Sequence, residues 1–445
     1  MMKDIRYYIT MGVALATIAL VGCSRFEEDD LFDESAALRI EHNADKLQNI
    51  LVNAPYGWVM QYYVGRGVSV FEGFNLFAKF ESGGKVTLAG NHRFLRNGNA
   101  GKYTEYSSLY ELIREDGLVL AFNTWNDVLT PFVDPVAHWA APENLLKDGE
   151  GMQGDQNLVV MSMSENELLF RGERYDALIR MIKADRDWQT YIDDTQAMKN
   201  QITGEGINSY YITAEDETMY CVGLRDGRYR ISDRIKNPLK IDSLSCCFTP
   251  TGFRNERPDT IVGHVFQEFK MNEEGTALVN EDGTVRIIAT WDTSLAESTE
   301  IMWIDAESLS DELLALYDQL NEALATENKN YSLIRLGIGR TTNANNVTGL
   351  VMEWKISRTK RGQGGMELRR SVPALGQMTI TCAPDAILDN EMKTHNGDVI
   401  AKVREFGAAL AGTYQMTPNS NFVPTDVQFQ ALEGTKSFRL VMEVK

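Results

Sequence analysis

Tight turns between short segments rich in aromatic and β-branched residues most constrain what this chain can fold into. Turn sequences recur at Ser82-Gly83-Gly84-Lys85, Glu115-Asp116-Gly117, Arg225-Asp226-Gly227-Arg228 and Glu281-Asp282-Gly283. Gly-Gly and Asp-Gly pairs between such segments favour β-hairpins, because these residues accept the backbone conformations that a tight turn needs. We therefore predict an α+β fold that is β-dominated, with antiparallel sheets, short hairpin connections and a few packed helices.

Four longer stretches show helical periodicity. Apolar residues recur at helical spacing over residues 34–53, 186–201, 310–325 and 399–410, and we expect a helix in each. We also expect a short helix over residues 125–130. Because a helix followed by several strands recurs along the chain, the sequence is compatible with a diverged helix-plus-sheet repeat.

The amino terminus has the pattern of a lipoprotein signal peptide. Lys3 and Arg6 precede an apolar run over residues 11–20, which is too short to cross a bilayer as a mature helix. The run ends in Leu20-Val21-Gly22-Cys23, which resembles a lipobox. We therefore predict a signal peptide over residues 1–22, cleavage before Cys23, and a palmitate-type lipid on Cys23 that attaches the protein to a membrane.

An acidic segment follows the predicted lipid site. Residues 23–33 include Glu27-Glu28-Asp29-Asp30, which anionic headgroups repel, so we expect an extended and solvated tether. The segment is also similar to the acidic signal by which lipoproteins of Bacteroidota reach the outer face of the outer membrane. That similarity implies a lipid-anchored outer-membrane protein that faces the cell exterior.

Length and charge restrict the rest of the organisation. The 445 residues carry a formal net charge of −19, which disfavours nucleic acid as a partner, because phosphates require a basic face. A hydrophobic content of 43% suits a packed globular protein. We expect an α+β domain over residues 34–305, which could divide near residue 186, and a second α+β domain over residues 306–445.

The cysteines do not suggest a disulfide framework. The chain has five cysteines and no CxxC pattern. Cys246 and Cys247 are neighbours in an apolar run, so on a strand they would point to opposite faces of the sheet. We interpret both as small core residues, with a disulfide or a metal ligand as the alternative.

Five segments carry a resemblance to a known family. They are residues 53–58 (Asn-Ala-Pro-Tyr-Gly-Trp), 117–126, 151–155 (Gly-Met-Gln-Gly-Asp), 168–172 and 187–192 (Asp-Trp-Gln-Thr-Tyr-Ile). In order and spacing they resemble domain of unknown function 4302, a family of Bacteroidota surface lipoproteins, over about residues 34–300. The resemblance implies a surface lipoprotein, often encoded near glycan-import proteins of the SusC/SusD type and a zinc metallopeptidase-like lipoprotein. It implies no established activity.

No sequence motif identifies an enzyme. The five histidines form no HExxH pattern, GxSxG is absent, and Gly337-Ile338-Gly339 lacks the Lys-Ser/Thr of a phosphate loop, so we place it in a strand. A catalytic pair of carboxylates cannot be chosen from sequence, because the separation that matters is spatial. The sequence favours a non-enzymatic protein, with a surface hydrolase of dispersed site residues as the alternative.

One loop-rich stretch combines aromatic rings with polar side chains. It contains Trp125, Asn126, Asp127, His138 and Trp139. Pyranose sugars have an apolar face and a polar rim, so an aromatic ring beside amides or carboxylates can bind them. The simpler interpretation is that both tryptophans pack in the core, and a sugar-binding site is the alternative.

A glycine-rich acidic loop is a weaker candidate. Asp148, Glu150 and Asp155 could supply oxygen ligands to Ca²⁺. The spacing does not match an EF-hand, and a plain solvated loop is the simpler interpretation.

A basic cluster is the third candidate. Around Gly362-Gln363-Gly364-Gly365, which we expect at a hairpin tip, stand Arg358, Lys360, Arg361, Arg369 and Arg370. Such a tip is usually only a soluble turn. The alternative is a contact for an anionic glycan, for lipopolysaccharide or for an acidic partner.

These observations predict a lipid-anchored surface protein that binds a glycan, a glycoprotein or a SusC/SusD-like partner in a nutrient-acquisition system. A purely structural partner of an outer-membrane transporter is a further alternative. We expect no cofactor other than the Ca²⁺ considered above.

Overall fold

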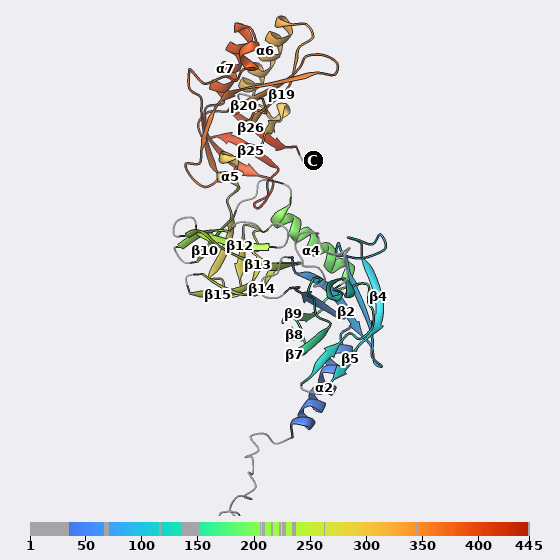
Figure 1. The fold of residues 1–445 in the computed structure, drawn as a ribbon. Coiled ribbons are helices and arrows are strands. Elements are labelled where there is room, and N and C mark those ends of the chain that lie inside the picture. The colour runs from blue at the N-terminus through green and yellow to red at the C-terminus, as the bar shows by residue number, and fades with distance from the viewer. Residues whose placement is uncertain are drawn as a thin grey trace, which may run out of the picture.

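The computed structural model arranges the chain as three successive β-rich units (Figure 1). It describes residues 35–65, 71–114, 117–135, 151–204, 206, 210–214, 217–221, 224, 228–233, 237–261, 263–343 and 346–443. The predicted signal peptide, Cys23 and the acidic tether lie outside these residues. The β-dominated α+β class with antiparallel sheets is confirmed.

The first unit is a nine-stranded antiparallel sheet with the order β4-β3-β2-β1-β9-β8-β7-β6-β5. Its helices are α2 (Ala36–Val52), which Ser35 caps, and α3 (Thr130–Val133). Central strand β1 is buried on both faces, with Trp58, Met60 and Tyr62 in the core beside α2. The strands are β1 (Trp58–Tyr62), β2 (Phe74–Phe80), β3 (Lys85–Gly90), β4 (Thr104–Leu109), β5 (Glu111–Ile113), β6 (Val119–Ala121), β7 (Asn157–Met163), β8 (Glu167–Gly172) and β9 (Leu178–Lys183).

The second unit is a closed barrel whose neighbouring strands follow chain order. Alternate residues point inward, as Tyr210, Ile212 and Ala214 of the first strand do. Helix α4 (Trp188–Thr203), which Asp187 caps, precedes the barrel and contributes Ile202 to its core. The strands are β10 (Tyr210–Ala214), β11 (Glu217–Cys221), β12 (Arg228–Asp233), β13 (Asn237–Thr249), β14 (Gly252–Ile261), β15 (His264–Met271), β16 (Ala277–Asn280) and β17 (Val285–Ala289).

The third unit repeats the topology of the first, with the strand order β21-β20-β19-β18-β26-β25-β24-β23-β22. Its helices are α5 (Trp291–Glu297), α6 (Asp311–Glu327) and α7 (Gly397–Ala409), with the 3-10 turns η2 (Ala306–Ser308) and η3 (Met392–Thr394). Its strands are β18 (Met302–Ile304), β19 (Ser332–Arg340), β20 (Thr348–Lys355), β21 (Arg361–Glu367), β22 (Arg369–Ser371), β23 (Gln377–Thr381), β24 (Gly412–Pro418), β25 (Asp426–Ala431) and β26 (Ser437–Met442).

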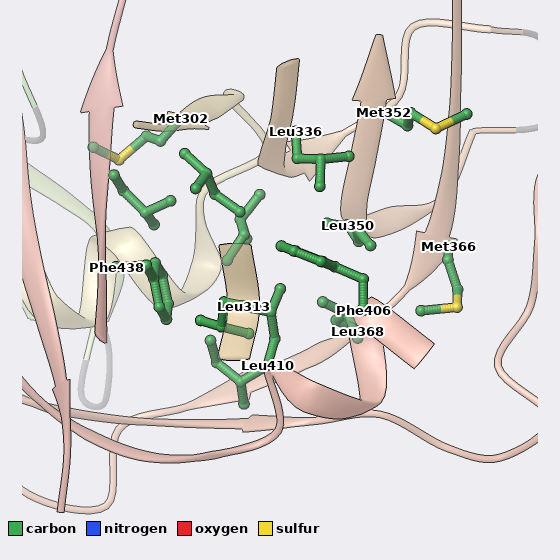
Figure 2. Close-up of a cluster of buried hydrophobic side chains, with 14 of the residues drawn as sticks. Met302, Leu313, Leu336, Leu350, Met352, Met366, Leu368, Phe406, Leu410 and Phe438 are labelled. Atoms are coloured by element: carbon green, nitrogen blue, oxygen red, sulfur yellow. The ribbon is translucent and has the colours of Figure 1, made fainter. Parts of the chain in front are cut away.

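Apolar side chains from α6, α7 and the sheet fill the core of the third unit. Figure 2 shows Leu313 of α6 and Phe406 of α7 beside Leu336 and Leu350 of the sheet. All four side chains are almost fully buried. Burial of each such side chain stabilises the fold by roughly 1.5–3 kcal/mol.

All three units share one pairing pattern, in which the first strand of each pairs with its last strand. The closing pairs are β1–β9, β10–β17 and β18–β26, all antiparallel. Each unit is therefore an up-and-down meander. The barrel is complete, whereas the two sheets are open between β4 and β5 and between β21 and β22. The sequence was compatible with a repeat, and the structure shows a repeat of strand topology.

Helix α4 joins the first unit to the barrel. Its residue Tyr191 packs with Val59 and Phe77 on the second face of the first sheet, while Ile202 enters the barrel core. The start of β2 contacts the barrel directly, because the Asn75 amide donates a hydrogen bond to the carbonyl of Phe248 at 2.7 Å. The two units are thus held by apolar and polar contacts together.

A loop of the third unit closes one part of the barrel core. Phe422, between β24 and β25, is 1% exposed and belongs to the barrel cluster, with its ring 6.0 Å from that of Tyr210. The Asn419 side chain accepts hydrogen bonds from the backbone N–H groups of Thr425 and Asp426, which holds the loop in a tight turn. Phe422 therefore links the third unit to the second.

Most predicted helices are confirmed, and one is wrong. The four long helices correspond to α2, α4, α6 and α7. Residues 125–129 form a loop rather than a helix, and α3 begins only at Thr130. The expected domain boundary after residue 305 falls directly after β18, the first strand of the third unit. The expected division near residue 186 falls between β9 and α4. Among the described residues, no helix is long and apolar enough to cross a membrane.

Candidate functional site

The segment that carries Trp125 runs along the edge of the first sheet. It follows β6 and lies beside β4, the edge strand. The Thr124 hydroxyl accepts a hydrogen bond from the N–H of Leu109 at 2.8 Å, and the Asn126 amide donates to the carbonyl of Tyr106 at 3.1 Å. An unpaired edge strand is a liability that proteins cover. The loop provides that cover.

Asn126 holds this loop and is not available to a ligand. It is 1% exposed, and its amide also donates to the Ser108 hydroxyl at 2.9 Å while its oxygen accepts from the N–H of Val128 at 3.0 Å. Asparagine favours such turns because its short side chain can replace a backbone partner. The sequence-based assignment of Asn126 as a ligand contact is therefore corrected to a structural role.

Trp125 is exposed, against the simpler expectation of a core position. Its exposed fraction is 45%. The indole N–H donates to Asp127 at 2.6 Å, and the guanidinium of Arg96 lies 5.1 Å from the centre of the ring. The ring is thereby fixed at the surface with a cation against one side and a carboxylate at its edge.

Tyr106 adds a second exposed ring at the same edge. It is 38% exposed, and its carbonyl is the acceptor for Asn126. We call the residues Arg96, Tyr106, Trp125 and Asp127 the Trp125 surface. His138 and Trp139, which the sequence grouped with Trp125, lie outside the described residues.

Asp155 is a structural residue, which corrects its assignment as a calcium ligand. It is 3% exposed, and its carboxylate accepts hydrogen bonds from the N–H groups of Arg174 and Tyr175. Burial raises the pKa of Asp155, although those backbone hydrogen bonds oppose the shift. Asp148 and Glu150 lie outside the described residues, within which no group of metal-binding side chains was found.

The glycines before Asp155 also have structural reasons. Gly151 has φ +57°, and a Cβ atom there would lie 2.7 Å from the carbonyl oxygen of Asp134. A Cβ on Gly154 would lie 2.6 Å from the Tyr62 hydroxyl, which itself donates to the carbonyl of Asp155 at 2.7 Å. This part of the loop is packed against the first sheet.

The basic cluster does not form one patch. Arg358 and Lys360 lie in the turn between β20 and β21, and Arg361 begins β21. Arg369 and Arg370 lie at the opposite end of β21, in β22. Arg370 donates to the carbonyls of Leu295 and Ser298 and is therefore bound within the third unit. The glycines lie inside β21 rather than at the tip. At Gly362 the side chain of Trp354 occupies the space that a Cβ atom would need.

A cleft at the junction of the first two units was not visible in the sequence. Its volume is about 300 Å³, and its walls come from β2, the loop after β3, helix α4 and the rim of the barrel. We call it the junction cleft. Among its lining residues are Asn75, Asn91, His92, Tyr191, Thr195 and Gln196. Because these residues come from separate parts of the chain, no local pattern could bring them together.

Three residues of the junction cleft contain buried polar atoms that have no hydrogen-bond partner within the described chain. The atoms are His92 Nδ1, the Tyr191 hydroxyl and Thr195 Oγ1. Such atoms are few in native proteins, and each costs about 1–3 kcal/mol when it is left unsatisfied. The lining residues of the larger hollow of about 670 Å³ beside α2 contain none of these atoms.

Comparisons with solved structures gave weak likenesses. The beta chain of DNA polymerase III from Streptococcus pneumoniae TIGR4 is 8% identical, with 92% of this chain and 98% of that chain covered and a TM-score of 0.14. The corresponding subunit from Borrelia burgdorferi is 10% identical, with the same coverages and a TM-score of 0.12. At these TM-scores the likeness supports no statement about fold or function.

The search of curated proteins found no match. One family model matches residues 28–273, which is more than half of the chain. The match contains all five segments that carried the resemblance, and it spans the first unit and most of the barrel. This chain belongs to the family described as Domain of unknown function (DUF4302).

Proposed function

We propose that this chain is a non-enzymatic, lipid-anchored protein of the cell surface that binds a glycan through the Trp125 surface. The observation that carries the binding proposal is the exposure of Trp125 at 45% on a loop whose other polar groups are engaged in holding it. The lipobox at Cys23 supports the attachment. The acidic tether supports the outward-facing outer-membrane position.

The chemistry of the Trp125 surface suits a sugar. A large exposed ring offers an apolar platform for the C–H face of a pyranose, at a low entropic cost because the ring is rigid. Asp127 supplies acceptors for hydroxyl groups at the edge of that platform, and the guanidinium of Arg96 lies against one face of the ring. The hydrogen bond from the indole to Asp127 fixes the ring before the ligand arrives, which reduces the cost of binding.

The rival hypothesis of a surface hydrolase, with a site assembled from distant carboxylates or histidines, predicts a cavity that holds two carboxylates with raised pKa or three ligands of a metal. Burial raises the pKa of Asp155 and of Glu256. These carboxyl groups lie in different units, and neither lines the junction cleft or the hollow beside α2. Binding is therefore the function that the described geometry favours.

Replacement of Trp125 by alanine should reduce glycan binding at least tenfold and leave stability nearly unchanged. The reason for the loss is removal of the platform, and the reason for unchanged stability is that surface positions contribute little to folding. The measurement is a glycan and mucin array with the chain from residue 31 onward, which retains every described residue. Affinities for the positive glycans are then determined in solution.

Tyr56→Ala is the matched control for this experiment. Tyr56 is also an exposed aromatic residue, at 51%, but it lies outside the Trp125 surface. Its replacement should leave the array pattern intact. If Trp125→Ala and the unmodified protein bind the same glycans equally well, the Trp125 surface is not the binding site. If neither binds any glycan, a protein partner becomes the better hypothesis.

Replacement of Cys23 by serine should abolish lipid labelling and move the protein from the membrane fraction to the soluble fraction. A serine cannot accept the thioether-linked lipid, and the proposed membrane attachment depends on that lipid. Labelling with a clickable fatty acid and fractionation of cells give the measurement. Cys382→Ser, a change at a half-buried cysteine, should retain both label and location. Retention of label in Cys23→Ser would refute the anchor.

A further inference from the structure

We propose that the hollow beside α2 binds a sugar acid, which is a monosaccharide that carries a carboxylate as well as hydroxyl groups. The hollow has a volume of about 670 Å³, which lies within the range of small-ligand sites. One wall comes from α2, and the other comes from the turn between β7 and β8 and from the end of β9. The site is separate from the Trp125 surface, and the proposal does not depend on glycan binding there.

The first wall is one side of a firmly held helix. Its lining residues are His42, Asp45, Lys46, Asn49, Ile50 and Asn53. Residues three and four positions apart share a side of a helix, so these six lie along one side of α2 over about 16 Å. The other side of α2 is fixed in the core, where Leu47 and Leu51 are buried and the Trp58 indole donates to the carbonyl of Leu51 at 3.1 Å.

The second wall is held by backbone hydrogen bonds. The N–H of Lys183, at the end of β9, donates to the carbonyl of Asn166 at 2.9 Å, which ties β9 to the turn that carries Glu165. Within that turn the Ser164 hydroxyl accepts from the N–H of Glu167 at 3.0 Å. Glu165 and Lys183 are therefore presented by a fixed backbone. Pre-formed walls are the usual property of small-ligand sites.

The polar side chains of the hollow are accessible and unengaged. Lys46, Asn49, Asn53 and Glu165 are exposed, and Lys183 is half-buried. Within the described residues, none of these five side chains takes part in a hydrogen bond or an ion pair. A ligand that enters the hollow can therefore bind them without displacing a partner from the protein.

The unpaired charges favour an anion of low charge. Two lysines against Glu165 leave one net positive charge, although the whole chain carries −19. The fourth charged group, Asp45, lies 3.6 Å from the guanidinium of Arg114, which offsets it. A carboxylate can accept charge-assisted hydrogen bonds from the ammonium groups of Lys46 and Lys183. A phosphate ion carries more negative charge, so Glu165 and Asp45 would repel it more strongly.

The other groups of the hollow match hydroxyls. The carboxylate of Glu165 can only accept, so it needs a donor, and the amides of Asn49 and Asn53 each offer donors and an acceptor. A sugar hydroxyl both donates and accepts, whereas an ionised simple acid such as acetate offers no donor. Ile50 adds apolar surface for the C–H groups of a ring. D-Glucuronate combines a carboxylate and hydroxyls on one ring and therefore meets all of these requirements.

The probes are pairs of sugars that differ at the carboxylate, namely D-glucuronate with D-glucose and D-galacturonate with D-galactose. Saturation-transfer NMR and calorimetry on the purified full chain give the affinities. We expect each uronate to bind about tenfold more tightly than its neutral counterpart, because only the uronate forms charge-assisted hydrogen bonds. Acetate should bind more weakly than D-glucuronate. Equal affinity for D-glucuronate and D-glucose, or for D-glucuronate and acetate, would overturn the proposal.

The decisive variants are Lys46→Met and Lys183→Met, which remove a charge and keep an unbranched side chain. Each should lower the affinity for D-glucuronate about 3- to 10-fold, and the double variant should lose more. Thermal stability should stay nearly unchanged, because neither ammonium has a partner in the described chain.

Lys393→Met is the matched control, because Lys393 is an exposed lysine of the third unit. It should leave the affinity for D-glucuronate unaltered. Trp125→Ala should do the same, which separates this site from the Trp125 surface. Unaltered affinity in the double lysine variant would refute the assignment of the hollow. Absence of saturation transfer from both uronates would refute the proposed ligand class.

Discussion

Replacing Phe422 by alanine should loosen the barrel while the third unit, which carries Phe422, stays folded. The side chain is 1% exposed and fills space between the barrel strands. Truncation of a buried phenylalanine costs about 3–5 kcal/mol, because the lost transfer energy is joined by the energy of the cavity. Phe422 lies on a loop, so the loop of the variant can also leave the barrel. The free energy of that separation is the upper limit of the cost. The barrel would then lose its contact with the third unit as well.

Hydrogen exchange followed by mass spectrometry can resolve this effect by unit. Peptides from β14 to β17 should exchange faster in Phe422→Ala, and peptides from α7 and β26 should keep their protection. Leu375→Ala is the control, because Leu375 is 80% exposed on another loop of the third unit. Unchanged protection of the barrel, or equal loss in all three units, would contradict the role of Phe422 as a barrel core residue.

Stability of the first unit should fall as the pH decreases from about 6.5 to about 4, and His92 should account for about 3 kcal/mol of that fall. Burial against Phe132, with ring centres 4.6 Å apart, lowers the pKa of His92 to about 4 in the folded state. The unfolded chain protonates near pH 6.5, so it binds the proton more readily than the folded chain. The stabilisation is therefore complete above pH 6.5 and is lost as the pH falls through 4.

Comparison with His92→Gln isolates this contribution. Glutamine keeps a hydrogen-bond donor and does not titrate, so the difference between the two stability curves should be flat above pH 6.5 and change below it. Hydrogen exchange of β1 to β3 gives the local free energy at each pH. Asp155 and Glu256 have raised pKa values and act with the opposite sign, but both are present in the two proteins and cancel. Parallel curves would show that His92 is protonated equally in both states.

The local features of the fold could be predicted, whereas its closure could not. The turn at Ser82-Gly83-Gly84-Lys85 does connect β2 and β3, with Gly83 and Gly84 at positive φ. Cys246 and Cys247 do lie on opposite faces of β13, with Cys246 in the barrel core and Cys247 beside Asn75 of the first unit. Turn and strand periodicity are local properties of sequence. The pairing of Trp58 with Lys183 is not a local property, because no pattern in the residues between them indicates that the two strands pair.

The candidate sites differ in the same way. The sequence pointed to Trp125, but its exposure depends on hydrogen bonds of Thr124 and Asn126 to a distant edge strand. The simpler interpretation of Trp125 as a core residue failed for that reason. The junction cleft had no signal at all, because Asn75, His92 and Thr195 belong to three separate elements. Only the packing of α4 between two units makes them neighbours.

The pairing of first and last strands determines the order in which the units can close, because the chain is synthesised from its amino terminus. The first unit cannot close until residue 183 is available to β1, and the barrel cannot close until residue 289 reaches β10. Contacts this distant in sequence form slowly, so each unit waits as an unclosed meander. Phe422 arrives later still, which leaves the barrel without its last core residue until β24 has been made. The third unit closes last of all, because β18 cannot pair with β26 until residues 437–442 have been made.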